Sequence, residues 1–477
     1  MKKIIFCGIV LYGLMFLLQG CSKFTEITPK GANILNRVSD LDLLLNFNYS
    51  LGSVNDAGGA FSERDAEVLV NDEYPIAINV ANMLAGTNKD LNYALVTYNE
   101  SVDRKTLAVT DAKFEKMYSI IDNVANPVIK NVDAASGDRV KGNQLKAEAY
   151  IIRAYMHYLL VNLYARAYNP ATAATDGGIP YVKEDNLLTV PNVKSTVAEV
   201  YANIVADINA ALALNSLLAV PVNNMRVGLG FAYGVQADVL LSMRNYTGAL
   251  AAANASLAIN STIIDDNLYK PVGTVIFGKP AVTSPDNLFY AAYSSPNVQT
   301  ISPDLLTYYE PGNVINSYVK PYYPSVSGAY AISGVTGGPL WYYTASAYAI
   351  NNAGITTSET SLIAAECLAR TQNISGAMAI INAIRKKRIV ASSYADLTAT
   401  TEAQAMGYLK RLARTEYLFT LKTYLNMKRW NTEDAYKETI TRNVNGQTFQ
   451  LKPDSPLWIF PFPQSGTNYN LNLTHNY

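Results

Sequence analysis

The residues of this sequence best suited to bind a ligand are aromatic, and they are concentrated between residues 288 and 350. This segment holds 11 of the chain's 34 tyrosines. Aromatic rings present flat apolar faces to sugar rings or peptide side chains, and a hydroxyl or indole N–H can fix the orientation of a bound molecule. The sequence therefore predicts a ligand platform, whose candidate residues are Tyr308, Tyr309, Tyr322, Tyr323, Trp341, Tyr342 and Tyr343. The alternative is that these rings pack the segment onto the rest of the protein or face a partner.

Residues that could perform acid–base or metal chemistry are sparse or poorly spaced. The acidic stretches at residues 62–67 and 71–74 lack the ligand spacing of an EF-hand, so we expect them to be solvated loop charges. The two histidines, His157 and His475, and the cysteine Cys367 are too few for a His/Cys metal site. We expect His157 to be packed in a helix and Cys367 to be a small buried apolar residue. No metal and no cofactor is predicted.

Two glycine-containing stretches imitate nucleotide-binding motifs without their essential residues. Residues 273–280 resemble a P-loop, but Pro280 stands where a Ser or Thr hydroxyl would hold Mg²⁺. Residues 228–233 contain G-x-G but lack the third glycine and a preceding strand. Neither G-x-S-x-G nor H-E-x-x-H occurs in the chain. The sequence thus favours a binding protein over an enzyme, and it leaves open a glycosidase, whose two carboxylates can come from distant positions.

The elements expected to hold the aromatic segment are two helical hairpins, one on each side of it. Residues 245–251 and 373–379 share the form N-[YI]-[TS]-G-A-[LM]-A within apolar patterns of helical period. Each copy, the first at residues 226–260, predicts two short helices joined by a tight turn, with alanines that allow close packing. The pair resembles tetratricopeptide-type units, which scaffold or bind ligands. The alternative is two unrelated hairpins with alanine-rich turns.

The rest of the chain favours a mostly α-helical protein. Residues 145–163 are apolar nearly all round and predict a central helix, and Thr196 with Glu199 forms the capping box that begins another helix. Residues 265–350 lose helical periodicity and are rich in Pro, Gly and Tyr, so they predict a loop-rich insertion.

Charge is balanced over the chain, with 38 Lys and Arg against 38 Asp and Glu. This balance argues against nucleic acid or anionic lipid as the principal partner. One basic run, residues 385–388, closes a predicted helix. We expect it to be a solvated helix end, because cations complement the dipole at a helix C-terminus.

The first 21 residues predict a lipoprotein export signal. Lys2 and Lys3 precede an apolar run, residues 4–18, which is too short to span a bilayer and has the length of a signal-peptide core. Gly20 before Cys21 is the small residue that lipoprotein processing needs, and acyl chains on Cys21 would anchor the mature chain. A plain secretory signal with an incidental cysteine is the alternative. We expect a signal peptide at residues 1–20, a lipid-anchored tether at 21–37 and a single helical domain at 38–477 with its loop-rich insertion at about 265–350.

Fragments spread over the mature chain share a family pattern. They are residues 21–31, 118–126, 153–164, 178–182, 200–207, 364–385, 428–430, 457–463 and 470–476. In their order and spacing they resemble the SusD/RagB family of outer-membrane nutrient-binding lipoproteins of Bacteroidetes-type bacteria. One departure lies in the family's usual E-R-x-x-E…D-L-x-R-W pattern, found here within residues 412–430. Asn426 stands where an Asp is common, which puts a structural salt bridge in doubt.

The resemblance implies a SusD-like helical fold with four tetratricopeptide-like helix pairs as scaffold. It also implies an outer-membrane protein, facing the cell exterior, that captures an oligomeric nutrient and delivers it to a SusC-like TonB-dependent transporter. A glycan is the first expectation for this nutrient, and a peptide ligand or a structural or adhesive role are the alternatives. Trp430 and Trp458 lie in family-wide motifs and are expected in the core.

Overall fold

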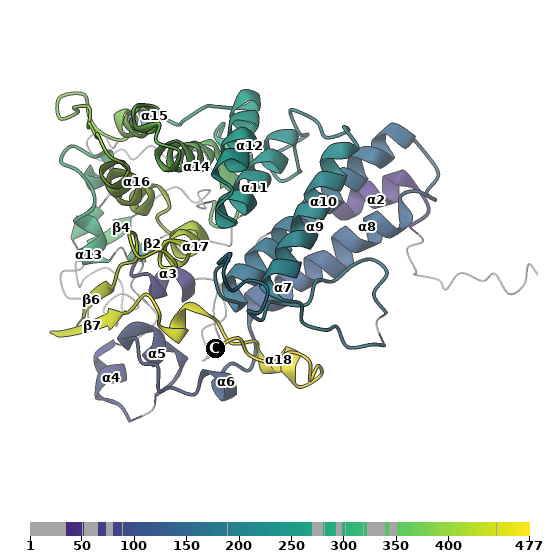
Figure 1. The fold of residues 1–477 in the computed structure, drawn as a ribbon, viewed down its shortest axis with the longest axis horizontal. Helices are drawn as coiled ribbons and strands as arrows, with labels where there is room; N and C mark the ends of the chain where they lie inside the picture. The colour runs from purple at the N-terminus through teal and green to yellow at the C-terminus, as the bar shows by residue number, and fades with distance from the viewer. Residues whose placement is uncertain are drawn as a thin grey trace, which may run out of the picture.

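Helices dominate the structure, and its strands are few and short (Figure 1). The computed structural model describes residues 35–49, 51, 65–72, 80–87, 89–187, 189–269, 280, 282–291, 298–300, 302–317, 319–321, 339–342, 351–444 and 446–477. The predicted mostly α-helical class is confirmed. Within these ranges, none of the helices combines the length and the apolar character that crossing a bilayer requires.

Helix α9 (Arg139–Tyr164) is the centre of one half of the molecule (Figure 1). It contacts α2 (Val38–Leu45), α7 (Ala112–Ile120), α8 (Asn126–Asn131) and α10 (Val197–Ala213). Most of its residues from Leu145 onward are buried, as the apolar pattern predicts. The predicted capping box begins α10: Glu199 N donates to Thr196 Oγ1 at 3.2 Å, and Thr196 N donates to Glu199 Oε2 at 2.8 Å.

His157 lies wholly buried in α9, as expected. Val182 N donates to its Nε2 at 3.0 Å, so the proton of the neutral ring is on Nδ1, which donates to Arg153 O at 2.8 Å. The ring also stacks on Tyr181 with 3.8 Å between centroids. Burial lowers the pKa of His157 to about 3. This histidine therefore packs the core and carries no charge at neutral pH.

The two copies of the sequence repeat form two helix pairs. The first pair is α11 (Leu229–Ser242) with α12 (Tyr246–Ile259), and the second is α14 (Thr357–Arg370) with α15 (Ile374–Lys386). Helix α12 packs against α14, so the two pairs are neighbours, and alanines fill most of the contact. Cys367 is fully buried in this contact, as predicted.

The shared motif has the same role in both pairs, because its asparagine caps the second helix. Asn245 and Asn373 each accept a hydrogen bond at 3.0 Å from the N–H of the glycine three residues later. A Cβ on Gly376 would lie 2.9 Å from the Asn373 side chain, so glycine leaves room for the cap. The residue before each asparagine has a positive φ, 61° at Arg244 and 65° at Gln372, which ends the preceding helix. The predicted repeat is therefore one local structure used twice.

Three consecutive helix pairs, α9–α10, α11–α12 and α14–α15, are each packed internally. The last two long helices are arranged differently, since α16 (Glu402–Glu416) packs on α14 and α15 whereas α17 (Leu421–Trp430) packs on α3 (Asp65–Leu69). The chain breaks between them at Phe419, whose φ is 58°, and Thr420 caps α17. Helices α16 and α17 would be the fourth helix pair that the resemblance implies, but they pack mainly on different helices. One contact between them is the hydrogen bond from Arg414 Nη1 to Met427 Sδ at 3.2 Å.

Asn426 does not remove the ion pair that its position put in doubt. Arg429 binds both carboxylate oxygens of Glu366 at 2.7 Å, and Asn426 Oδ1 accepts from Arg429 at 2.8 Å. The indole N–H of Trp430 donates to the same carboxylate at 3.1 Å. Trp430 and Trp458 are both buried, as expected.

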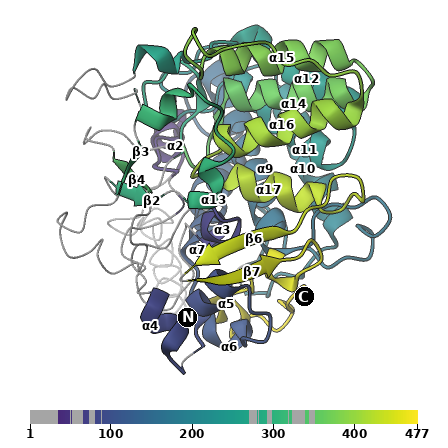
Figure 2. The ribbon, with the colours of Figure 1, turned by 90° about the vertical axis from the view of Figure 1, so that its left-hand side faces the viewer.

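The insertion contains short strands that the sequence did not predict. Strand β4 (Pro339–Tyr342) lies between β2 (Val298–Thr300) and β3 (Val319–Pro321), antiparallel to both. Figure 2 shows this small sheet beside α13 (Pro303–Leu306). The remaining α-helices and strands are α4 (Val80–Ala85), α5 (Leu91–Thr97), α6 (Arg104–Leu107), β1 (Asn287–Phe289) paired with β5 (Ile355–Thr356), β6 (Ile440–Val444) paired with β7 (Gln447–Leu451), and α18 (Gln464–Thr467).

Candidate ligand-binding site

The predicted aromatic residues fall into three groups. Tyr322, Tyr323 and Tyr343 lie outside the described residues. Trp341 and Tyr342 belong to β4, the central strand of the small sheet, so their backbone is placed next to β2 and β3.

The third group, Tyr308 and Tyr309, follows α13, and the two rings have different surroundings. Tyr309 is only 8% exposed and packs with Leu305, Ile315 and Phe419. Its ring thus has the packing role that was the alternative to ligand binding. Tyr308 is half-buried, and it lines two hollows in the protein surface.

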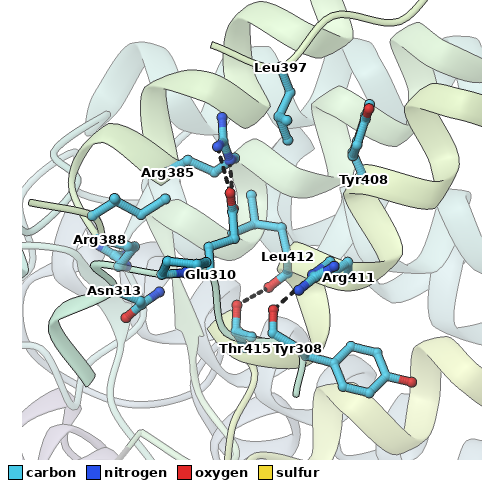
Figure 3. A pocket seen from close by; sticks show the side chains of 12 residues that line it. Tyr308, Glu310, Asn313, Arg385, Arg388, Leu397, Tyr408, Arg411, Leu412 and Thr415 are labelled. Atoms are coloured by element: carbon cyan, nitrogen blue, oxygen red, sulfur yellow. Dashed lines mark hydrogen bonds and ion pairs between the residues drawn. The ribbon is translucent and has the colours of Figure 1, made fainter. Parts of the chain in front are cut away.

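The two hollows lie on either side of Tyr308 and Arg411, which line both of them. One, of about 250 Å³, is enclosed by α15, α16 and residues 308–313 (Figure 3). The other, of about 360 Å³, includes Lys410, Arg414 and Glu438 in its lining. Volumes of this size approach the lower end of known small-molecule sites. A ligand spanning both hollows would cross the Tyr308–Arg411 ridge.

Helix α16 positions Tyr308 through its arginines. The guanidinium of Arg411 donates to Tyr308 O at 2.9 Å and to Thr307 O at 3.1 Å. The guanidinium of Arg414 lies 5.1 Å from the centre of the Tyr308 ring, a cation–π distance. Gly407, Arg411 and Arg414 are spaced i, i+4, i+7 and therefore share one face of the helix. This spacing is the sequence signal by which the site could have been found.

Arg414 is held from behind by Asp72, which corrects the prediction of solvated loop charge for this carboxylate. Glu73 of the same stretch lies outside the described residues. Asp72 is fully buried and accepts a hydrogen bond from Arg414 at 2.8 Å. Val70 O accepts a second hydrogen bond from Arg414 at 3.1 Å. Burial raises the pKa of Asp72, and the positive charge of Arg414 offsets this in part. The two residues are 342 positions apart, so no local pattern could predict their pairing.

In the basic run at residues 385–388, Arg385 and Arg388 are buried, which corrects the prediction of a solvated helix end for these two residues, whereas Lys386 is exposed as predicted and Lys387 is partly exposed. Arg385 donates to both oxygens of Glu310, at 2.8 and 2.7 Å, and Arg388 donates to both oxygens of Glu416, at 2.7 and 2.8 Å. The hydrogen bonds from Arg385 lower the pKa of Glu310. Arg385 lies in the last turn of α15 and anchors Glu310 of the insertion to the repeat, whereas Arg388 follows the end of α15 and joins it to α16.

The arrangement suits binding better than hydrolysis. Each hollow has one lining carboxylate, Glu310 or Glu438, and each is bonded to a cation, Arg385 or Lys410. Hydrolysis of a glycosidic bond usually needs two carboxyl groups on opposite sides of that bond. In the part of the chain that the structure describes, no cluster of three His, Cys, Asp or Glu could hold a metal ion.

A sequence comparison finds a family match for the N-terminal part of this fold. Residues 58–226 match the model of a SusD-like family described as "Starch-binding associating with outer membrane". The matched part includes Asp72, and the hollows lie beyond it. No curated protein sequence matches the chain.

The fold of the chain is similar to several solved structures. For a SusD superfamily protein of Bacteroides thetaiotaomicron the TM-score is 0.70 at 17% identity, over 92% of this chain and 100% of the other. A SusD-like carbohydrate binding protein of Bacteroides vulgatus gives a TM-score of 0.68 at 16% identity, over 92% of this chain and 97% of the other. A SusD-like carbohydrate binding protein of Bacteroides fragilis gives a TM-score of 0.63 at 14% identity, over 92% of this chain and 99% of the other. The fold of the chain is therefore SusD-like, and the family match over residues 58–226 agrees with the resemblance seen in the sequence.

Proposed function

We propose that this protein is a surface lipoprotein that binds an oligomeric nutrient, a glycan in the first place, at the two hollows beside Tyr308. The observation that carries the proposal is the half-buried Tyr308 ring on the ridge between the hollows, within the aromatic-rich insertion. An aromatic face beside polar groups is the usual arrangement for recognising a sugar ring. The names of the similar proteins, starch-binding and carbohydrate binding, point to the same ligand class.

In this proposed role the protein is anchored to the membrane and delivers its ligand. Cys21 would carry the lipid, residues 21–37 would form the tether and residues 38–477 the binding domain. The bound glycan would pass to a SusC-like TonB-dependent transporter in the outer membrane, in keeping with the family description of association with that membrane. Capture of such a transporter by the full lipoprotein supports delivery, and its absence from a detergent-solubilised complex favours an adhesive role.

A glycan and peptide array probed with the soluble form lacking residues 1–21 tests the ligand class. We expect binding of glycans without their hydrolysis, since the hollows lack a free pair of carboxyl groups. Release of shortened oligosaccharides by the pure protein would contradict a role in binding alone. Binding confined to peptides would replace the proposed ligand class.

The small sheet is a second part of the proposed platform. We predict that at least one of Trp341→Ala and Tyr342→Ala weakens binding of the array-selected glycan by about tenfold. Calorimetric titration of the two folded variants provides the measurement. Unchanged affinity in both variants would remove β4 from the site.

A further inference from the structure

The linings of the two hollows are markedly cationic. In the first, three cations stand against the carboxylate of Glu310, and they are Arg385, Arg388 and Arg411. In the second, three cations stand against the carboxylate of Glu438, and they are Lys410, Arg411 and Arg414. Neutral sugars need no such excess of positive charge, because their hydroxyl groups are bound equally well by amides, hydroxyls and paired carboxylates.

Most of these cations are already neutralised by a carboxylate. The pairs are Arg385 with Glu310 at 2.7 Å, Arg388 with Glu416 at 2.7 Å, Arg414 with Asp72 at 2.8 Å and Lys410 with Glu438 at 3.0 Å. Arg388 also lies 3.6 Å from Asp266. Asp72, Asp266 and Glu416 are not among the lining residues, so their charges lie behind the guanidinium groups that face the hollows.

Arg411 is different, because the ion pairs found among the described residues do not include it. Two backbone carbonyls, Tyr308 O and Thr307 O, accept from its Nε and Nη2. These bonds fix the plane of the guanidinium without neutralising its charge. The side chain is exposed and lines both hollows. The protein thus holds one oriented positive charge where the linings of the two hollows meet, on the backbone carbonyl of the residue that carries the Tyr308 ring.

We propose that the ligand of this site is an acidic glycan, with an anionic group on one sugar ring bound by Arg411 while the apolar face of a ring rests on Tyr308. The proposal rests on the proposed function and specifies its substrate class. A uronic acid or a sulfated sugar combines the two features that this pair recognises, a flat C–H face and a negative charge at the ring's edge. Arginine suits both anions, since its planar donors match carboxylate and sulfate oxygens.

The position of Arg411 at an exposed ridge sets the expected size of the effect. A charge-assisted hydrogen bond that stays partly hydrated is worth about a factor of ten in affinity. Screening by salt reaches such a site, so the contribution of Arg411 should shrink as ionic strength rises.

The test is an array of paired oligosaccharides, each acidic member matched with its own neutral form. Uronic-acid oligosaccharides are paired with their carboxyl-reduced products, and sulfated ones with their desulfated products. We expect the acidic member of at least one pair to bind about tenfold more tightly than its neutral form. Preference within the carboxylate pairs or within the sulfate pairs tells the two anions apart.

Variants of Arg411 assign the preference to this residue. Arg411→Gln should remove the about tenfold preference for the acidic glycan over its neutral form, and Arg411→Lys should keep part of that preference. The readout is the ratio of the two affinities, because loss of the bonds to Thr307 O and Tyr308 O can lower both affinities together. Arg139→Gln is the control, because Arg139 is an exposed arginine that also donates to two backbone carbonyls, Val132 O and Asp133 O, and differs from Arg411 in its ion pair with Asp133 at 3.6 Å. Thermal unfolding verifies that the variants are folded.

The outcomes separate the two proposals. Equal binding of acidic and neutral forms, or an acidic preference that survives Arg411→Gln, would overturn the acidic-glycan proposal and leave glycan binding intact. Absence of any glycan binding, or selection of acidic peptides alone, would overturn both. Loss of the preference at high salt in the wild type, with no salt dependence left in Arg411→Gln, is the pattern that the proposal requires.

Discussion

Glu359 and Glu366 lie two turns apart on α14, yet their surroundings give them opposite acid–base behaviour. Lys422 contacts Glu359 at 2.5 Å and Asp238 at 2.6 Å, so two buried carboxylates share one ammonium group. Burial raises the pKa of Glu359 to about 7. Burial acts in the same direction on Glu366, but Arg429 and Arg370 outweigh it and lower its pKa. The local charge balance, and not burial alone, decides which form of each carboxyl group is stable.

The raised pKa of Glu359 predicts a pH-dependent stability. A carboxyl group with a higher pKa in the folded chain than in the unfolded chain binds its proton more tightly when folded. Its contribution is complete below the ordinary value of 4.5 and is lost as pH rises towards about 7. We expect Glu359→Gln to flatten the fall in unfolding free energy between about pH 5 and pH 8, measured by urea denaturation.

Glu366→Gln is the comparison for this experiment, because the lowered pKa of Glu366 has the opposite sign. Its contribution is present above 4.5 and lost as pH falls through its folded pKa. This variant should therefore destabilise the protein at neutral pH and lose that effect in acid. The same pH slope in wild type and Glu359→Gln would show that Glu359 does not titrate in this range.

At the scale of elements, the repeated motif acts through its helix caps. Asn373 is exposed, so its main contribution is the hydrogen bond from Gly376 N to its side chain. We predict that Asn373→Ala lowers the free energy of unfolding by about 1 kcal/mol. Asn373→Asp keeps the acceptor and should keep most of the stability. Denaturant unfolding of the two variants provides the measurement, and equal loss in both would show that the cap is not the source of the effect.

Local sequence patterns predicted the helices and their caps, but they could not predict ion pairs between residues far apart in the chain. The apolar stripe of α9, the Thr196 cap and the Asn245 and Asn373 motif all depend on residues within a few positions, and each was found from the sequence. The partner of Arg414 is Asp72, at the other end of the chain. A buried carboxylate and a loop carboxylate look alike until the fold brings a cation to one of them. For the same reason Tyr308 and Tyr309, adjacent and identical in type, could not be told apart.

The whole molecule combines a stacked helical frame with an insertion that is fastened to it at charged points. Arg385 of α15 forms an ion pair with Glu310, and Arg411 of α16 donates to the carbonyls of Thr307 and Tyr308. Both helices are therefore bonded to the segment that follows α13. These bonds fix the Tyr308 ridge before a ligand arrives, which reduces the entropy lost on binding. Helix α15 of the second repeat thus positions the candidate site without forming its aromatic surface.

If a ligand binds at the Tyr308 ridge, the Tyr308→Ala variant should bind the array-selected glycan more weakly than the wild type. Tyr150→Ala is the matched control, because the Tyr150 ring is also half-buried and lies 5.3 Å from a guanidinium, that of Arg153. We predict that isothermal titration calorimetry gives about tenfold weaker binding for Tyr308→Ala and unchanged binding for Tyr150→Ala. Unchanged affinity in a folded Tyr308→Ala protein would contradict the account.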